Sequence, residues 1–448
     1  ALLDPLDALE PRATQSGPPE GERSGPARSV GGAVHSPGGA VHSPGGAVHS
    51  SGGAVHSPGG AVHSPGGAVH SPGGAVHSPG GAGSGLGRGE ASVADGGGVD
   101  RQVAQLLARA PGPDEAAAAA VAERARRVLR PAGALARLDE LAAWLAGWQG
   151  SERPAVRRPA AVVFAADHGV AASGVSAYPA EVTAAMLKAL REGVATASVL
   201  ARQVGATLDV VDVGVGDPTG DLTREPALDP ARFRTSLQAG RDAVAGLDAD
   251  LLVLGEMGIG NTTAAAAVTA ILLGRSAAAS TGRGTGVDDA GLARKLAAVT
   301  AARRRVGPGV APMEVLRQAG GAELAALAGA ALEARLRRLP LVLDGFVVTA
   351  AVAPLAWLHP GALGNAVAGH RSAEPGHQAL LERLGMPPLL ELGMRLGEGS
   401  GALAAVPLLR LAAAAVTEVA TFAEWGLDNG PAGSGSGASS GGAREEPR

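Results

Sequence analysis

The chain has 448 residues, of which 46% are hydrophobic and 18% are charged, as is usual for a globular protein. Its formal net charge of −4 and its few aromatic residues disfavour nucleic-acid binding, which needs a basic surface and stacking rings. The absence of cysteine excludes disulfides, thiolate catalysis and cysteine-ligated zinc. It suits a reducing compartment, and we expect a cytoplasmic protein.

The first part of the chain is predicted to be a disordered arm over residues 1–98. Seven near-identical copies of GGAVHSP run from Gly31 to Pro79, and each has two glycines and almost no apolar bulk. Such a segment cannot bury enough apolar surface to offset the entropy lost on ordering. Its histidines either bind a metal loosely or belong to a tandem expansion without a role. Residues 430–448, rich in glycine and serine, are predicted to be a disordered tail.

Strand and helix patterns alternate in the remaining residues 99–429. Short apolar runs typical of buried strands occupy 160–167, 207–214, 250–256 and 341–348. Helical spacing occupies 114–129, 134–147, 180–203, 262–273, 288–305, 322–336 and 402–425. The alternation predicts an α/β fold with a parallel, Rossmann-like sheet flanked by helices. The first two helices would form a smaller helical lobe. No membrane span is predicted, because the apolar runs end at charged residues.

Six polar or glycine-rich pieces lie next to these elements. Four of them end strands, and GRGTGVDD and GEGSG each precede a helix. In open parallel sheets, ligands bind outside the carboxyl ends of the strands, so we expect the pieces to face one crevice. The six are residues 167–169, 212–217, 255–263, 282–289, 344–346 and 397–401.

The stretch GEMGIGNTT suggests an anion cradle. Glycines such as Gly258 allow close approach to the backbone, and Asn261 or Thr262 is expected to cap the following helix. An ordinary helix cap explains the same residues. Asp167 and His168 are either a catalytic or metal-binding pair or a strand end that satisfies backbone groups.

Three further charged residues have two interpretations each. In isolation, Lys295 fits a solvated lysine of a basic helix, and Asp344 fits either a ligand of ribose hydroxyls or a turn cap. Glu398 is an acid between glycines. A carboxylate with few polar neighbours has a raised proton affinity and suits a general base, but the helix dipole also favours an acid at a helix start.

Taken in order, these motifs resemble the nicotinate-nucleotide–dimethylbenzimidazole phosphoribosyltransferase family. The resemblance rests on ADHGV, DVG, GEMGIGNTT, GRGTGVDD, LPLVLDGF, GHRSAEPGH and MRLGEGSGA, and it spans about Val103 to Leu427. It implies a cytoplasmic homodimer without metal or redox cofactor. The implied reaction transfers phosphoribosyl from nicotinate mononucleotide to 5,6-dimethylbenzimidazole and contributes to cobalamin synthesis.

The resemblance also implies roles for individual residues. Glu398 matches the family's general base, Glu256 an acid near the reacting centre, and Lys295 a lysine near the phosphate. The remaining expected substrate-binding residues are Gly258, Asn261, Thr262, Asp167, His168, Asp344 and Gly399.

Some features depart from the family pattern. The stretch between Val213 and Leu251 is shorter than usual and replaces a glycine-rich strand, so a sheet edge or a wall of the nucleotide site is expected to differ. Tyr178 and Met186 leave the choice of base open, and the repeat arm is foreign to the family. The alternative is a degenerate relative that binds nucleotide without turnover. A nicotinamide-dependent dehydrogenase is disfavoured, because no GxGxxG follows the first strand.

Overall fold

A computed structural model describes residues 96–427. The predicted tail and the predicted arm with its GGAVHSP repeats lie outside the described residues, apart from residues 96–98 at the end of the arm. Helix α1 (Gly96–Arg109) begins before the expected boundary at residue 99. Val99 and Asp100 are buried, and Asp100 accepts a hydrogen bond from the amide of Met313 at 3.0 Å. The folded region therefore includes the whole of this helix.

The sheet is parallel and five-stranded, with the order β2-β1-β3-β4-β5. This confirms the predicted α/β class. Its strands are β1 (Pro159–Ala166), β2 (Thr207–Gly214), β3 (Leu251–Met257), β4 (Leu341–Leu343) and β5 (Ala366–Ala368). The expected strand over 341–348 was too long, because α11 begins at Phe346. Strand β5 was missed, since three residues leave almost no periodicity to read.

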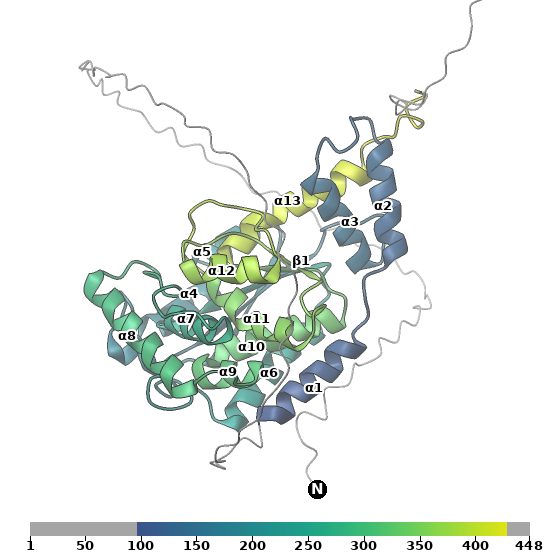
Figure 1. The fold of residues 1–448 in the computed structure, drawn as a ribbon. Helices are drawn as coiled ribbons and strands as arrows, with labels where there is room; N and C mark the ends of the chain where they lie inside the picture. The colour runs from purple at the N-terminus through teal and green to yellow at the C-terminus, as the bar shows by residue number, and fades with distance from the viewer. Residues whose placement is uncertain (1–95, 428–448) are drawn as a thin grey trace, which may run out of the picture. The chain divides into compact units, whose positions relative to one another are not determined.

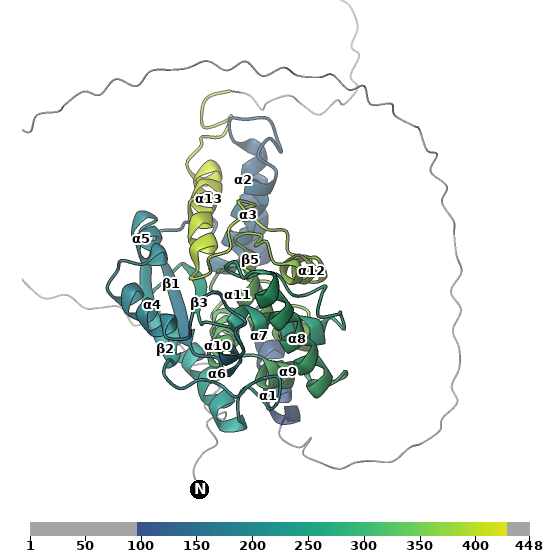
Figure 2. The ribbon, with the colours of Figure 1, turned by 90° about the vertical axis from the view of Figure 1, so that its left-hand side faces the viewer.

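Helices cover both faces of the sheet because alternate strand residues point to opposite sides. Val162, Leu252 and Leu343 belong to one apolar cluster, whereas Val163, Val253 and Val342 belong to the other. The first face packs against α1, α6 (Pro230–Ala245), α7 (Asn261–Leu272), α8 (Asp289–Val306), α9 (Pro312–Ala319), α10 (Ala322–Leu336), α11 (Phe346–Leu358) and α12 (Pro375–Leu384). The second packs against α3 (Arg137–Gln149), α4 (Val182–Arg191), α5 (Thr196–Gln203) and α13 (Ser400–Thr417). Figure 2 shows the strands between these two groups.

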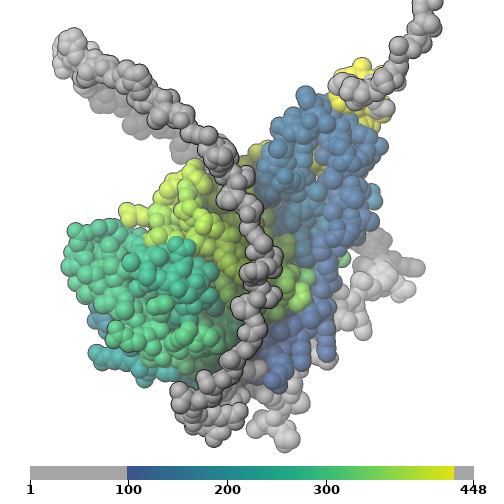
Figure 3. All heavy atoms as spheres, in the orientation of Figure 1, coloured from purple at the N-terminus to yellow at the C-terminus, as the bar shows by residue number. Residues whose placement is uncertain are grey.

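The expected helical lobe is present, but it has a third member. Helices α2 (Glu115–Arg127) and α3 bury Val121 and Ala146 against Val416 of α13. Figure 1 shows these three helices side by side, and the blue surface in Figure 3 belongs to α1, α2 and α3, the first helices of the described chain. Helix α13 therefore joins the lobe to the sheet.

Several helix boundaries differ from the expected ones. The pattern over 180–203 forms two helices, α4 and α5, which are separated around Gly193 with φ +77°. Helix α13 ends at Thr417, short of the expected 425. Helix α13 is long and apolar enough to span a membrane, but its buried residues pack on the sheet and on α3, as those of a core helix do.

Helices α6 and α10 cross with almost no space between their backbones. A Cβ atom added to Gly240 would lie 1.8 Å from the carbonyl oxygen of Ala326, and one added to Gly329 would lie 1.9 Å from that of Leu237. Nearby, Arg241 of α6 donates to Glu333 Oε2 of α10 at 3.0 and 2.8 Å, and both residues are buried. Backbone atoms cannot yield as a side chain can, so glycine is required at both positions.

We predict that Gly240→Ala destabilises the protein by about 1–3 kcal/mol, since overpacking forces the helices apart. Chemical denaturation checks this. Gly246→Ala is the control: no atom lies within 4 Å of its added Cβ, and its stability should be nearly unchanged. An equal change in both variants would contradict the close crossing.

Candidate active site

A pocket lies at the carboxyl ends of β3, β4 and β5. Its lining comes from the loops after these strands and from two irregular segments, around Gly284 and Arg395–Gly397. Four of the six expected pieces therefore meet, as the parallel sheet requires. Residues 167–169 and 212–217 do not line it. The cavity volume is about 100 Å³.

The loop after β3 brings the start of α7 to the pocket. Gly260 is the N-cap, with φ +98°, so the expectation that Asn261 or Thr262 caps the helix was wrong. Asn261 is instead the first helical residue, and its Nδ2 donates to Glu256 Oε2. Gly258, Asn261 and Thr262 all line the pocket. The positive end of the helix dipole is thus directed at the cavity.

Lys295 is buried, so its interpretation as a solvated lysine was wrong. Its side chain is among the largest that are fully buried, and its Nζ donates to Thr262 Oγ1 at 2.9 Å. Burial lowers its pKa, while the charge of Glu374 opposes this shift. Only two of the 38 basic residues in the chain are lysines. A compact ammonium is thus placed behind Thr262 and Gly284, both of which line the pocket.

Glu374 organises the segment around Gly284. Its Oε2 accepts from the amide of Gly282 at 3.0 Å, and its Oε1 accepts from that of Gly284 at 2.7 Å. The residue lies in GHRSAEPGH, where sequence reasoning gave it no role. Neither its type nor its spacing indicates that it binds amides 90 residues away.

Glu256 is one of three acids that line the pocket, together with Asp344 and Glu374. It is buried, and its pKa lies well above the usual value because of desolvation first and the charges of Asp344 and Glu323 next. Its carboxylate approaches Gly397: a Cβ there would lie 2.5 Å from Glu256 Oε1. Burial of this kind favours the protonated form of the carboxyl group, and shifted carboxyl groups of this kind are common at functional sites.

Glu398 sits one residue beyond the lining residue Gly397. It is 4% exposed, and its Oε2 accepts from the amide of Ala197, just inside α5, at 3.4 Å. Burial raises the pKa of Glu398. Its φ of +62° is strained for a residue other than glycine, which indicates a side chain retained at some cost to stability. Its amide donates to Glu256 O at 3.1 Å, so the two acids are joined through the backbone.

Asp344 caps α13 from the end of β4. Its Oδ1 accepts from the amides of Gly401 at 2.7 Å and Ala402 at 3.0 Å, and its Oδ2 accepts from that of Gly399 at 3.3 Å. Of the two interpretations, the carboxylate shown here acts as a cap. Burial raises the pKa of Asp344 to about 7, against the effect of the three amides. Asp344 also lines the pocket, where His370 Nε2 lies 3.8 Å from its Oδ1.

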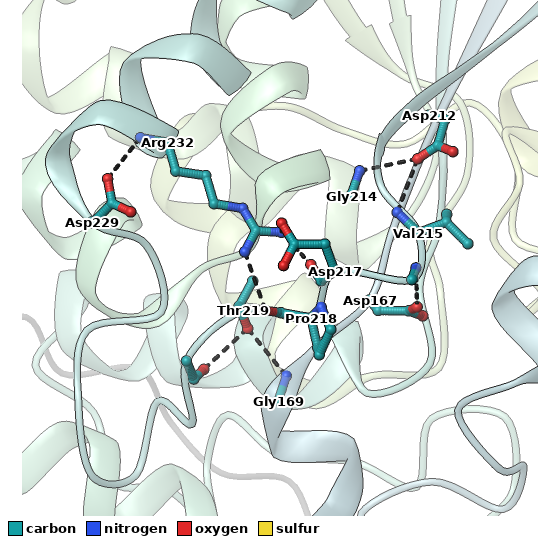
Figure 4. A network of polar contacts seen from close by, with 12 residues as sticks. Asp167, Gly169, Asp212, Gly214, Val215, Asp217, Pro218, Thr219, Asp229 and Arg232 are labelled. Atoms are coloured by element: carbon teal, nitrogen blue, oxygen red, sulfur yellow. Dashed lines mark hydrogen bonds and ion pairs between the residues drawn. The ribbon is translucent and has the colours of Figure 1, made fainter.

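Asp167 and His168 lie beside the pocket without lining it. Asp167 Oδ2 accepts from the amide of Gly216 at 2.8 Å, as a strand-end residue that satisfies backbone groups would (Figure 4). His168 Nε2 lies 2.5 Å from Oε1 of Glu323, with both side chains fully buried. This pair packs under Gly258, whose added Cβ would lie 3.0 Å from Glu323 Oε1.

The stretch after β2, which was expected to be shortened, runs from the edge strand into α6 and does not form a wall of the pocket. Arg232 of α6 donates to the carbonyl oxygens of Asp217 and Pro218, and Asp229 caps α6 through the amide of Arg232 (Figure 4). No residue of 213–251 lines the pocket. The expected change therefore falls on the edge strand β2 and its following loop.

Comparisons with known proteins agree with this arrangement. A family model described as "Phosphoribosyltransferase" matches residues 110–427. The nicotinate-nucleotide–dimethylbenzimidazole phosphoribosyltransferase of Mesorhizobium japonicum is 52% identical over 318 residues, which are 71% of this chain and 94% of the relative. That of Cereibacter sphaeroides is 50% identical and covers 71% and 95%. The crystal structure of CobT from Thermus thermophilus has a TM-score of 0.67 and 46% identity, over 70% of this chain and 100% of that one. The chain belongs to the nicotinate-nucleotide–dimethylbenzimidazole phosphoribosyltransferase family.

Proposed function

We propose that this protein transfers the phosphoribosyl group of nicotinate mononucleotide to 5,6-dimethylbenzimidazole. The products are α-ribazole 5′-phosphate and nicotinate, and the reaction contributes to the nucleotide loop of cobalamin. The observation that carries the proposal is one pocket lined by a helix N-terminus and three buried acids, with the buried Lys295 and Glu398 next to its lining residues, within a chain about half identical to enzymes of this name.

The phosphate of the nucleotide is proposed to bind at the start of α7. Gly258 and Thr262 line the pocket there, and Lys295 Nζ lies behind them. A helix N-terminus stabilises an anion through its free amides and dipole, and an ammonium adds a charge-assisted contact. The two amides that Glu374 holds, of Gly282 and Gly284, keep the facing segment in place.

Glu398 is proposed as the general base, with Glu256 beside it. A benzimidazole nitrogen attacks the anomeric carbon from the face opposite nicotinate. The bond to the nicotinate ring nitrogen breaks, that nitrogen takes the electron pair and loses its positive charge, and the configuration inverts. The proton on the attacking heterocycle passes to the carboxylate. Burial raises the pKa of Glu398, which makes the ionised carboxylate a stronger base.

The pocket must widen before both substrates fit. Its volume of about 100 Å³ is below the roughly 300–1,000 Å³ of most small-molecule sites. One wall, Arg395–Gly397, belongs to a segment without helix or strand, and Leu396 is 45% exposed. We propose that this wall moves aside and opens a path from the pocket to Glu398.

Two other properties, the oligomeric state and the compartment, are also proposed. A homodimer is proposed from the family resemblance, and exposed apolar side chains such as Leu411 and Trp425 are available for its interface. A cysteine-free chain suits the cytoplasm. The alternative of a relative without turnover has no observation in its favour among the described residues, since Glu256, Glu398 and Lys295 are in place and residues 213–251 lie away from the pocket.

Turnover tests the proposed function directly. The purified full chain is incubated with nicotinate mononucleotide and dimethylbenzimidazole, and the products are separated by chromatography. We expect equal amounts of nicotinate and α-ribazole 5′-phosphate. Nicotinate mononucleotide that binds without product formation would support the non-catalytic alternative instead.

Glu398→Gln should lower turnover at least about 100-fold, because the amide keeps the shape but cannot accept the proton. In the unsubstituted protein, the rate should fall as the pH drops through the raised pKa of Glu398, and the variant should lose this acid limb. Steady-state rates across pH check both. Glu391→Gln, at an exposed acid in the same segment, is the control. Near-normal turnover of a folded Glu398→Gln protein would show that Glu398 is not the general base.

Lys295→Ala should raise the Michaelis constant for nicotinate mononucleotide by about one to two decades, since a lysine–phosphate contact contributes roughly 1.5–3 kcal/mol. The constant for dimethylbenzimidazole should change less. Lys188→Ala removes the only other lysine, which is exposed and paired with Glu192, and should leave both constants unchanged. An unaltered nucleotide constant in the folded Lys295→Ala protein would place the phosphate elsewhere.

A further inference from the structure

A second pocket lies at the amino ends of the strands, whereas the active-site pocket lies at their carboxyl ends. Its lining includes residues just before β1, β3 and β4, so it occupies the amino ends of these strands, and its volume is about 340 Å³. We name it the arginine groove, after five of its lining residues: Arg153, Arg157, Arg158, Arg337 and Arg338.

The groove has a large excess of positive charge. Asp250 is its single lining carboxylate. Both oxygens of Asp250 accept from the amides of Arg157 and Arg158, at 2.8 to 3.0 Å, so this acid faces the backbone. Arg158 also pairs with the exposed Asp248 at 3.2 Å. Within the described residues, the side chains of Arg153 and Arg157 have no ion pair or hydrogen bond.

Two of the guanidinium groups are fixed by neutral partners. Arg337 donates to the carbonyl oxygens of Val244 and Leu247, and Arg338 donates to that of Gly147 at 2.8 Å. Carbonyl oxygens orient a guanidinium without neutralising its charge. Gln149 ties two further lining segments together, through hydrogen bonds with Ala155 and with the carbonyl oxygen of Asp250. The guanidinium groups of Arg337 and Arg338 are thus fixed in the groove by the protein itself and keep their positive charge.

Arg338 occupies a position that normally favours glycine. Its amide donates to the carbonyl oxygen of Arg335 and that of Leu339 donates to Ala334, which is the pattern of a Schellman cap at the end of α10. The residue in the left-handed conformation of such a cap is usually glycine, and Arg338 has φ +56°. An arginine in that conformation strains the backbone, which indicates a use for its side chain.

We propose that the arginine groove binds a small molecule that carries two or more phosphate groups. Guanidinium groups match phosphate through paired hydrogen bonds, and several fixed cations favour several linked phosphates over one. The volume suits a compact ligand rather than a long chain. Because the groove lies at the amino ends of the strands, the ligand does not compete with substrates at the carboxyl ends.

Calorimetry with inorganic tripolyphosphate tests this on the full chain, at ~0.15 M salt, where weak surface attraction is screened. We expect one ion per chain, unaffected by saturating nicotinate mononucleotide or by Lys295→Ala. The double variant Arg153→Gln, Arg157→Gln should raise the Kd at least ~10-fold. Both side chains are exposed and without partners among the described residues, so this variant should fold.

The matched control is Arg303→Gln, Arg304→Gln, which removes the same charge from exposed positions on α8 and should change the Kd less than about twofold. Equal losses in both variants would reduce the binding to overall charge and overturn the proposal. So would the absence of binding, or inorganic phosphate that binds as tightly as tripolyphosphate. A short single-stranded oligonucleotide that displaces tripolyphosphate at lower concentration would assign the groove to nucleic acid instead.

Discussion

The active site depends on the contact between the carboxylate of Asp344 and the first amides of α13. These groups come from the end of β4 and from a helix more than fifty residues later in the chain. The contact satisfies amides that a helix start leaves without partners, and it fixes the GEGSG turn against the sheet. Gly255 completes the junction, because a Cβ there would lie 2.5 Å from the amide nitrogen of Gly399. The junction thus holds Asp344 next to Glu398 and, through the amide of Glu398 on the carbonyl oxygen of Glu256, also fixes the position of Glu256.

The negative charges of the carboxylates near this junction repel one another, and this repulsion favours protonation of Glu256 and Glu398. Glu256, Asp344 and Glu398 are all buried, and desolvation is the first cause of the raised pKa of each. Each added negative charge makes the next proton easier to retain. A proton taken up by one of these groups can therefore be held without large rearrangement. The buried Lys295 has the complementary shift, and it lies on the side of the pocket where an anion would compensate it.

Sequence patterns predicted strands and helices that have a clear hydrophobic periodicity, but they did not predict the tertiary contacts between them. The first three strands and several helices, among them α8, α10 and α13, have periodicities that a single sequence shows, and the polar strand ends indicated the pocket. The patterns did not predict α1, α6, α9, α11 or α12. Strand β5 and the cap of α7 by Gly260 depend on tertiary context that no local pattern shows. The same holds for Lys295, whose helix is basic and whose burial follows from packing against α7. Asp167 and His168 looked like site residues, yet their partners are a backbone amide and a buried glutamate.

The left-handed backbone at Glu398 affects which substitutions at this position would stabilise the fold. Gly397, Glu398 and Gly399 have φ values of +89°, +62° and +82°, so a non-glycine residue stands within a left-handed run. Glycine at the central position would relieve strain of about 1–3 kcal/mol. If selection for turnover ceased, mutation would be free to improve folding by removing the acid on which the proposed chemistry depends. The residue proposed to carry the chemistry is therefore also the one whose replacement by glycine would relax this turn.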